Sequence, residues 1–187
     1  MNEFSSNKID GEKMGIGLKR GSVAVVPHQV EWETTAKQTI KELKLILENI
    51  AVDIQHIGST AIKNISAKPI IDIVIGVYDF KEILALNDKL SENGFIFRGQ
   101  DIPEQYLYVC GESDFRTHHI HVVIYNSSTW SNYINMRDYL NCHAADAHAY
   151  SRLKESLAKL YPNDRQKYTA LKSDFINNIL LKAQEAK

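Results

Sequence analysis

Hydrophobic positions along the chain follow two spacings, one typical of helices and one typical of strands. Across residues 32–50 apolar side chains recur every three or four positions, which predicts an amphipathic helix. Residues 51–57 alternate between apolar and polar side chains, and residues 70–77 are almost continuously apolar. The first pattern is typical of a half-buried strand, and the second of a strand that is covered on both faces.

The rest of the chain predicts further strands and then only helices. A short edge strand is expected at residues 22–26, ended by Pro27, and a helix at 81–93, ended by Gly94. Strands follow near 95–98, 106–110 and 117–125, and the last two form a hairpin around the polar turn 111–114. Three helices are expected after Asn126, one capped by Ser128, one at 144–160, and one that follows the break at Pro162.

These elements predict an α+β fold in which a mixed sheet with flanking helices precedes a helical C-terminal third. Residues 1–20 contain three glycines and no hydrophobic period, so we expect a mobile N-terminal tail there. Residues 21–187 are then expected to form a single domain, since this length suffices for one hydrophobic core.

Charge and cysteine content narrow the expected partners and location. The 22 Lys and Arg residues nearly balance the 23 Asp and Glu residues, so nucleic acid is not an expected partner. Cys110 and Cys142 have neither disulfide nor zinc spacing, which favours a reducing cytoplasmic location. The most apolar stretch, residues 70–77, is too short to span a bilayer, so no membrane role is expected, and the oligomeric state stays open.

The C-terminal helices carry an excess of positive charge. Residues 152–187 contain eight Lys or Arg residues against four Asp or Glu residues. We interpret this excess as a solvated helix surface; the alternative is a basic face beside an anionic ligand.

A candidate site begins at Gly58-Ser59 and Asp72. An acid inside a continuously apolar strand needs a partner, because burying a charge alone is costly. A Gly-Ser turn after a strand can hold phosphate oxygens, and an acid on the next strand can hold the divalent ion that neutralises them. The alternative is a plain turn beside a hydrogen-bonded core aspartate.

The second candidate group is the run His118-His119-Ile120-His121. Side chains alternate along a strand, so His119 and His121 should share one face while His118 points to the other. With Asp72 as a third ligand the pair could bind a transition metal, or it could transfer protons near neutral pH. Imidazole ligands would favour Zn²⁺ or Mn²⁺ over Mg²⁺. Hydrogen-bonded strand histidines with no such role are the alternative.

Three basic residues are candidates for anion binding. Lys68 and Arg116 suit phosphate or carboxylate groups, although each could instead pair with an acid structurally. Arg137 is followed by Asp138, so it could form a salt bridge or line the site.

Several motifs together are similar to the GrpB family of the nucleotidyltransferase superfamily. They occur in order over about residues 22–180: Val23-Ala24-Val25-Val26-Pro27 with Trp32, His56-Ile57-Gly58-Ser59-Thr60-Ala61, Ala67-Lys68-Pro69-Ile70-Ile71-Asp72-Ile73, Arg116-Thr117-His118-His119-Ile120-His121-Val122-Val123, Arg137-Asp138-Tyr139-Leu140 and Pro162-Asn163-Asp164-Arg165. The resemblance implies a nucleotidyltransferase-like fold, and it implies relatives in which this domain is fused to dephospho-coenzyme A kinase.

Two functions follow as hypotheses. The first is metal-dependent nucleotidyl or phosphoryl transfer to an unknown acceptor, with Mg²⁺, Mn²⁺ or Zn²⁺ as cofactor and a nucleotide as ligand. Catalytic and metal-binding roles would fall to Asp72, His119 and His121, and phosphate or substrate binding to His56, Gly58, Ser59, Lys68, Arg116 and Arg137.

The second hypothesis is a non-catalytic module that binds a small anionic ligand, such as a nucleotide or a coenzyme A precursor. Active nucleotidyltransferases carry a second carboxylate two positions after the first, and this chain has Val74 there. One carboxylate holds two metal ions less well than two, which favours the module. The clustering of histidine with Asp72 and arginine favours the enzyme.

Overall fold

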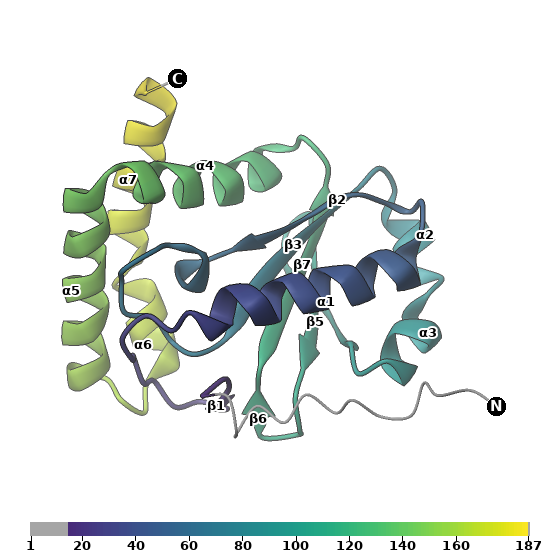
Figure 1. The fold of residues 1–187 in the computed structure, drawn as a ribbon, viewed down its shortest axis with the longest axis horizontal. Helices are drawn as coiled ribbons and strands as arrows, with labels where there is room; N and C mark the ends of the chain where they lie inside the picture. Colours follow the sequence, from purple (N-terminus) through teal and green to yellow (C-terminus); the bar gives the residue numbers. More distant parts are fainter. Residues whose placement is uncertain (1–14, 187) are drawn as a thin grey trace.

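The computed structural model describes residues 15–186, and its central feature is a five-stranded mixed sheet (Figure 1). In spatial order the strands are β2 (Ala51–Ile57), β3 (Ile71–Val77), β7 (His118–Ile124), β5 (Gln105–Cys110) and β4 (Ile96–Ile102). Strands β3 and β7 are parallel to each other, whereas the other neighbouring pairs are antiparallel. The expected hairpin is therefore present as the pair of β5 and β7.

One face of the sheet is covered by helix α1 (Glu31–Leu47), which runs across the strands in Figure 1. Its buried Trp32 and Leu43 belong to the main hydrophobic cluster together with Ile71 and Ile73 of β3. Alternation along β3 therefore sends these isoleucines toward α1 and sends Asp72 and Val74 to the opposite face.

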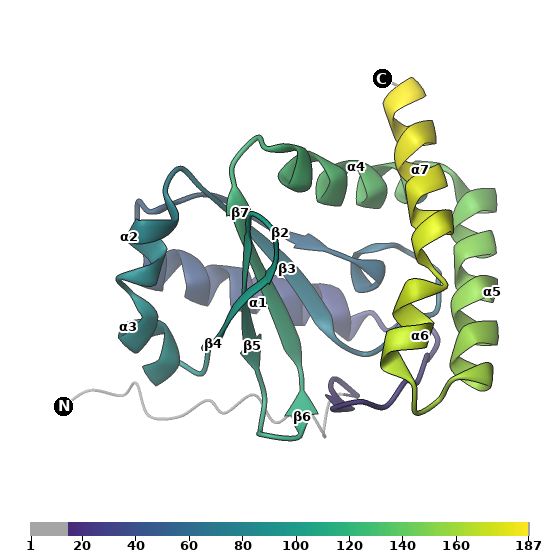
Figure 2. The same cartoon turned by 180° about the vertical axis from the view of Figure 1, so that it is seen from behind.

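The four C-terminal helices stand at the opposite end of the molecule from the two short helices α2 (Phe80–Leu84) and α3 (Asn87–Glu92) (Figures 1 and 2). They are α4 (Ser128–Cys142), α5 (Ala144–Leu160), α6 (Arg165–Ala170) and α7 (Ser173–Glu185). Trp130 of α4 packs on Ile57 and Val74 on the second face of the sheet. The predicted α+β architecture is confirmed. None of the helices in residues 15–186 is both long and apolar enough to cross a membrane.

The strand predicted at residues 22–26 is wrong. Only Val26 forms a bridge, with Ala67, while Val23 is buried against Leu157 and Tyr168. The side chains of Val23 and Val25 thus pack against the C-terminal helices, whereas Val26 packs against the main core.

The predicted mobile tail includes residues that are ordered. Residues 1–14 lie outside the described part of the chain. Ile16, however, is only 1% exposed, and β1 (Leu18–Lys19) pairs antiparallel with β6 (Phe115–Arg116). The prediction is therefore wrong for residues 15–20. Backbone pairing with the tip of the hairpin holds this segment in place, although its sequence shows no hydrophobic period.

Three predicted helix boundaries also differ. The helix expected at 81–93 is divided into α2 and α3, and the last helix is divided into α6 and α7. In the first case the chain turns after α2, and Asn87 accepts a hydrogen bond of 2.6 Å from the buried Tyr108 hydroxyl. In the second, the break places Lys172 between two helices. Helix α4 is capped by Ser127 and not by Ser128.

Candidate functional site

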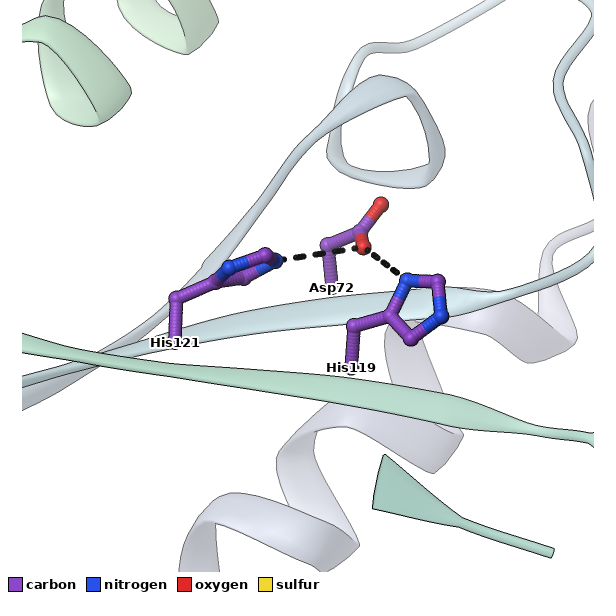
Figure 3. Close-up of side chains that lie close together, drawn as sticks. All are labelled: Asp72, His119 and His121. Carbon is purple, nitrogen blue, oxygen red and sulfur yellow. Dashed lines mark hydrogen bonds and ion pairs between the residues drawn. The ribbon is translucent and has the colours of Figure 1, made fainter. Parts of the chain in front are cut away.

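Strands β3 and β7 bring Asp72, His119 and His121 together (Figure 3). In the parallel register Asp72 lies beside His119, and Val74 lies beside His121. Both histidine rings point toward the Asp72 carboxylate, with His119 Nδ1 at 3.2 Å and His121 Nε2 at 3.6 Å from Oδ1. One donor atom from each residue lies within 4.8 Å of the other two. The three therefore converge on one sheet face, as alternation predicted.

These three donors could hold a divalent ion. Ligand atoms at about 2.1 Å from a common ion lie roughly 3.0 to 3.4 Å apart in octahedral or tetrahedral arrangements. The two contacts of Asp72 Oδ1, 3.2 and 3.6 Å, are close to that range. Two imidazole nitrogens and one carboxylate oxygen are a donor set that suits Zn²⁺ or Mn²⁺ better than Mg²⁺.

A hydrogen-bond chain orients the His121 ring. The Tyr133 hydroxyl donates to Gln105 Oε1 at 2.7 Å and lies 3.4 Å from His121 Nδ1. Because that hydroxyl donates its hydrogen to Gln105, its oxygen can accept a hydrogen bond from a protonated Nδ1 of His121. In that tautomer the lone pair of Nε2 faces Asp72, which is an arrangement that suits a cation between the two groups.

Asp72 is held in its anionic form. Burial by itself would raise the pKa of Asp72, but hydrogen bonds and charge from His119 and His121 outweigh it and hold that pKa well below the usual range. The carboxylate is consequently negative at neutral pH and available to a cation.

The Gly58-Ser59 turn packs directly against this carboxylate. Gly58 has a φ of 68°, and a Cβ placed on it would lie 2.5 Å from Asp72 Oδ2. Only glycine permits both the backbone conformation and the close approach. Ser59 then begins the short 3₁₀ helix η2 (Ser59–Ala61).

A cavity of about 340 Å³ lies between this sheet face and the C-terminal helices. Gly58, Ser59, Lys68, Arg137 and the Asp72 group all contribute to its wall, so the structure assembles most of the predicted site residues. Arg137 both lines the cavity and forms the salt bridge with Asp138, at 2.7 Å from Nε to Oδ1. Its Nη1 also donates to Gln55 Oε1 at 2.7 Å, which ties α4 to β2.

Two predicted site residues lie elsewhere. The His56 side chain is on the α1 face, because Ile57 and not His56 is paired with Asp72; its Nε2 lies 2.9 Å from the Thr60 hydroxyl. Burial lowers the pKa of His56 to about 4. Arg116 lies in an adjoining crevice, where its Nη1 donates to the Glu112 carbonyl oxygen at 2.6 Å.

The cavity also contains basic residues that were not predicted as site residues. Lys154 of α5, Arg165 of α6 and Lys172 all line it, next to Tyr150 and Tyr168. In the sequence, the excess of Lys and Arg in residues 152–187 was the signal that could have identified these residues. Its interpretation as a solvated surface is wrong for Lys154, which is 1% exposed.

Comparison with known proteins places the chain in a family. The profile of the "GrpB protein" family matches residues 22–182. The chain belongs to the GrpB family. The "Glutamate-rich protein GrpB" of Alkalihalophilus pseudofirmus is 36% identical over 172 residues, which are 88% of this chain and 98% of that protein.

Two solved structures extend this result to the fold. The conserved protein GrpB from Enterococcus faecalis superposes with a TM-score of 0.81 at 28% identity, over 87% of this chain and 98% of that chain. The Cid1 poly(U) polymerase superposes with a TM-score of 0.51 at 14% identity, over 72% of this chain and 44% of that chain. At that identity the second match shows only that this GrpB-family chain has a nucleotidyltransferase-like fold.

Proposed function

We propose that this GrpB-family chain binds a divalent transition-metal ion through Asp72, His119 and His121 and uses it in nucleotidyl or phosphoryl transfer from a nucleotide. The observation that supports this best is the convergence of three ligand atoms within 4.8 Å, in the wall of a ligand-sized cavity. The nucleotidyltransferase-like fold agrees with the proposal.

Several residues of the cavity wall have specific roles in this proposal. Asp72 and the two imidazoles hold the ion, which when bound would act as a Lewis acid toward a phosphate oxygen. Tyr133 keeps the Nε2 atom of His121 directed at the ion. Ser59 and the Gly58 turn donate hydrogen bonds to phosphate oxygens, and Lys68 offsets their charge as a point cation.

A second candidate is a module that binds a nucleotide or a coenzyme A precursor without turnover. One observation favours it. Val74 is fully buried against Ile57, Val123 and Trp130, so the position of a second carboxylate is part of a hydrophobic cluster.

Release of pyrophosphate and phosphate from each nucleoside triphosphate, with Mn²⁺ or Zn²⁺ and with dephospho-coenzyme A among the trial acceptors, tests the enzyme proposal. We expect metal-dependent release that Asp72→Asn and His121→Gln abolish. His148→Gln, which changes an exposed histidine on α5, should retain it. Release that persists in Asp72→Asn would contradict the proposed site, and saturable nucleotide binding without any release would favour the module.

A further inference from the structure

Three lysines from separate segments converge on the part of the cavity wall formed by Tyr150 and Tyr168. The Nζ atoms of Lys68 and Lys172 lie 5.3 and 4.5 Å from the centre of the Tyr168 ring. Lys154 Nζ lies 4.6 Å from the centre of the Tyr150 ring and donates a hydrogen bond to the Ser66 carbonyl oxygen. All three line the same cavity as Asp72.

Keeping these three lysines positively charged at these positions is electrostatically unfavourable. Burial is the main cause that lowers the pKa of Lys154 to about 7 and that of Lys172 to about 8, and positive neighbours lower both further. For Lys154 these neighbours are Lys172 and Lys68, opposed by Glu155 of α5.

Around Lys172 the neighbours are Lys68 and Arg165, opposed by Asp72. Lys154 is buried, and Lys68 and Lys172 are half-buried. Such a group of like charges persists where function requires it, because apolar residues of the same size would pack at lower cost.

The charges lining the cavity indicate what would relieve this cost. Among the described lining residues, Asp72 is the only carboxylate, and it already interacts with two histidines. The basic lining residues are Lys68, Arg137, Lys154, Arg165 and Lys172, of which Arg137 already pairs with Asp138. A ligand that balances the other four needs several adjacent negative charges, which a single carboxylate or a phosphate monoester does not supply.

We propose that Lys68, Lys154 and Lys172 form a binding site for a polyphosphate chain. A linear chain is favoured because the lysines and the Asp72–His119–His121 group lie in the wall of one continuous cavity. The proposal rests on the proposed function only where it sets the polyphosphate beside the metal ion; anion binding by the lysines requires no metal. A nucleoside triphosphate and inorganic polyphosphate share this chemistry, so both belong in the test.

Calorimetric titration with inorganic tripolyphosphate in EDTA tests the lysine cluster without the metal site. We expect saturable binding that Lys172→Met weakens about 10- to 100-fold, since methionine keeps the apolar stem and removes one charge-assisted contact. Lys154→Met should act similarly, and it serves as the second variant if either one folds poorly. Lys159→Met, at an exposed position on the same helix, should bind like the unchanged protein.

Proton exchange separates ligand binding from a merely structural role of the lysines. At pH 8.5, repeating the titration in buffers of different ionisation enthalpy should reveal net proton uptake, because the polyanion favours the charged lysines. Lys172→Met should reduce that uptake. ATP and UTP should bind more tightly than tripolyphosphate if the tyrosine wall also contacts a nucleoside.

Equal affinities in Lys172→Met, Lys154→Met and Lys159→Met would remove the lysines from the site, as would the absence of tripolyphosphate binding in the unchanged protein. Loss of Mn²⁺ binding has no bearing on these titrations, so failure of the metal proposal and failure of the anion proposal are distinguishable.

Discussion

The two faces of the central sheet are built from the same strands but differ in chemistry. On the α1 face His118 is fully buried, and its ring nitrogens lie 3.1 Å from the Thr39 hydroxyl and 2.9 Å from the Thr117 hydroxyl. On the cavity face His119 is 12% exposed and lies beside Asp72. Two residues that are adjacent in sequence thus have different roles. His118 completes a hydrogen-bond network in the core, and His119 belongs to a candidate metal site.

This contrast predicts that substitutions on the α1 face lower stability, whereas those on the cavity face change ligand binding. Val74 is the exception, because it lies on the cavity face and yet is fully buried. A charged substitution at Val74 should therefore change both stability and metal binding.

Val74→Asp should have the largest effect, a loss of roughly 3–4 kcal/mol of unfolding free energy without metal. The new carboxylate would be buried among apolar side chains beside the negative Asp72. Mn²⁺ should recover part of this loss, because an ion neutralises both acids. Melting with and without Mn²⁺ measures the effect, and an unchanged melting temperature in metal-free buffer would contradict it.

Substitutions of the neighbouring residues His118 and His119 should have different effects on stability and on Mn²⁺ binding. His118→Ala should lower the unfolding free energy by about 2–4 kcal/mol, because it leaves a cavity and unpaired threonine hydroxyls, and should leave Mn²⁺ affinity unchanged. The matched variant His119→Ala should lose most Mn²⁺ affinity at a cost of less than about 1 kcal/mol. Urea unfolding and Mn²⁺ titration of both variants make the comparison, and equal Mn²⁺ loss in both would abolish the distinction.

Acid should destabilise the protein through the α1 face. Burial lowers the pKa of His118 to about 4, below its usual 6.5, so between those values the unfolded chain binds the proton first. Stability should be fully present above pH 6.5 and should fall by about 2–3 kcal/mol as the pH approaches 4. His56, whose pKa is lowered in the same way, adds to the slope. His118→Gln should flatten the stability curve, and an unchanged slope would argue against the assignment.

Gly58→Ala should have a smaller effect on stability, about 1–2 kcal/mol, but should impair the cavity face. The methyl group would meet Asp72 Oδ2. Gly94→Ala is the matched control, since Gly94 also has a positive φ but open space around a Cβ. Both variants carry backbone strain, so only Gly58→Ala should weaken Mn²⁺ binding; equal weakening in both would mean that strain alone is responsible.

Local patterns in the sequence predicted the parts of this site that depend on strand geometry. Alternation was enough to place His119 and His121 on one face and His118 on the other. Alternation over residues 51–57 could also have excluded His56, because it places His56 on the same face as Val52 and Ile54 and opposite to Ile57.

The helical side of the cavity could not be predicted in the same way. Which lysines of residues 152–187 face inward depends on how α5, α6 and α7 pack against the sheet, and lysine stems fit both buried and exposed positions. Arg116 lies in the adjoining crevice and not in the main cavity wall, because it pairs in β6 with Leu18, in a segment whose sequence shows no hydrophobic period.

Calorimetric titration of Mn²⁺ and Zn²⁺ into the unchanged protein, Asp72→Asn and the control His148→Gln measures directly whether Asp72, His119 and His121 bind a divalent ion. We expect one ion per chain for the unchanged protein and for His148→Gln. The affinity of Asp72→Asn should be at least roughly 100-fold weaker, because its amide keeps the shape but loses the charge. Equal affinities in all three proteins, with equal melting temperatures without metal, would contradict this expectation.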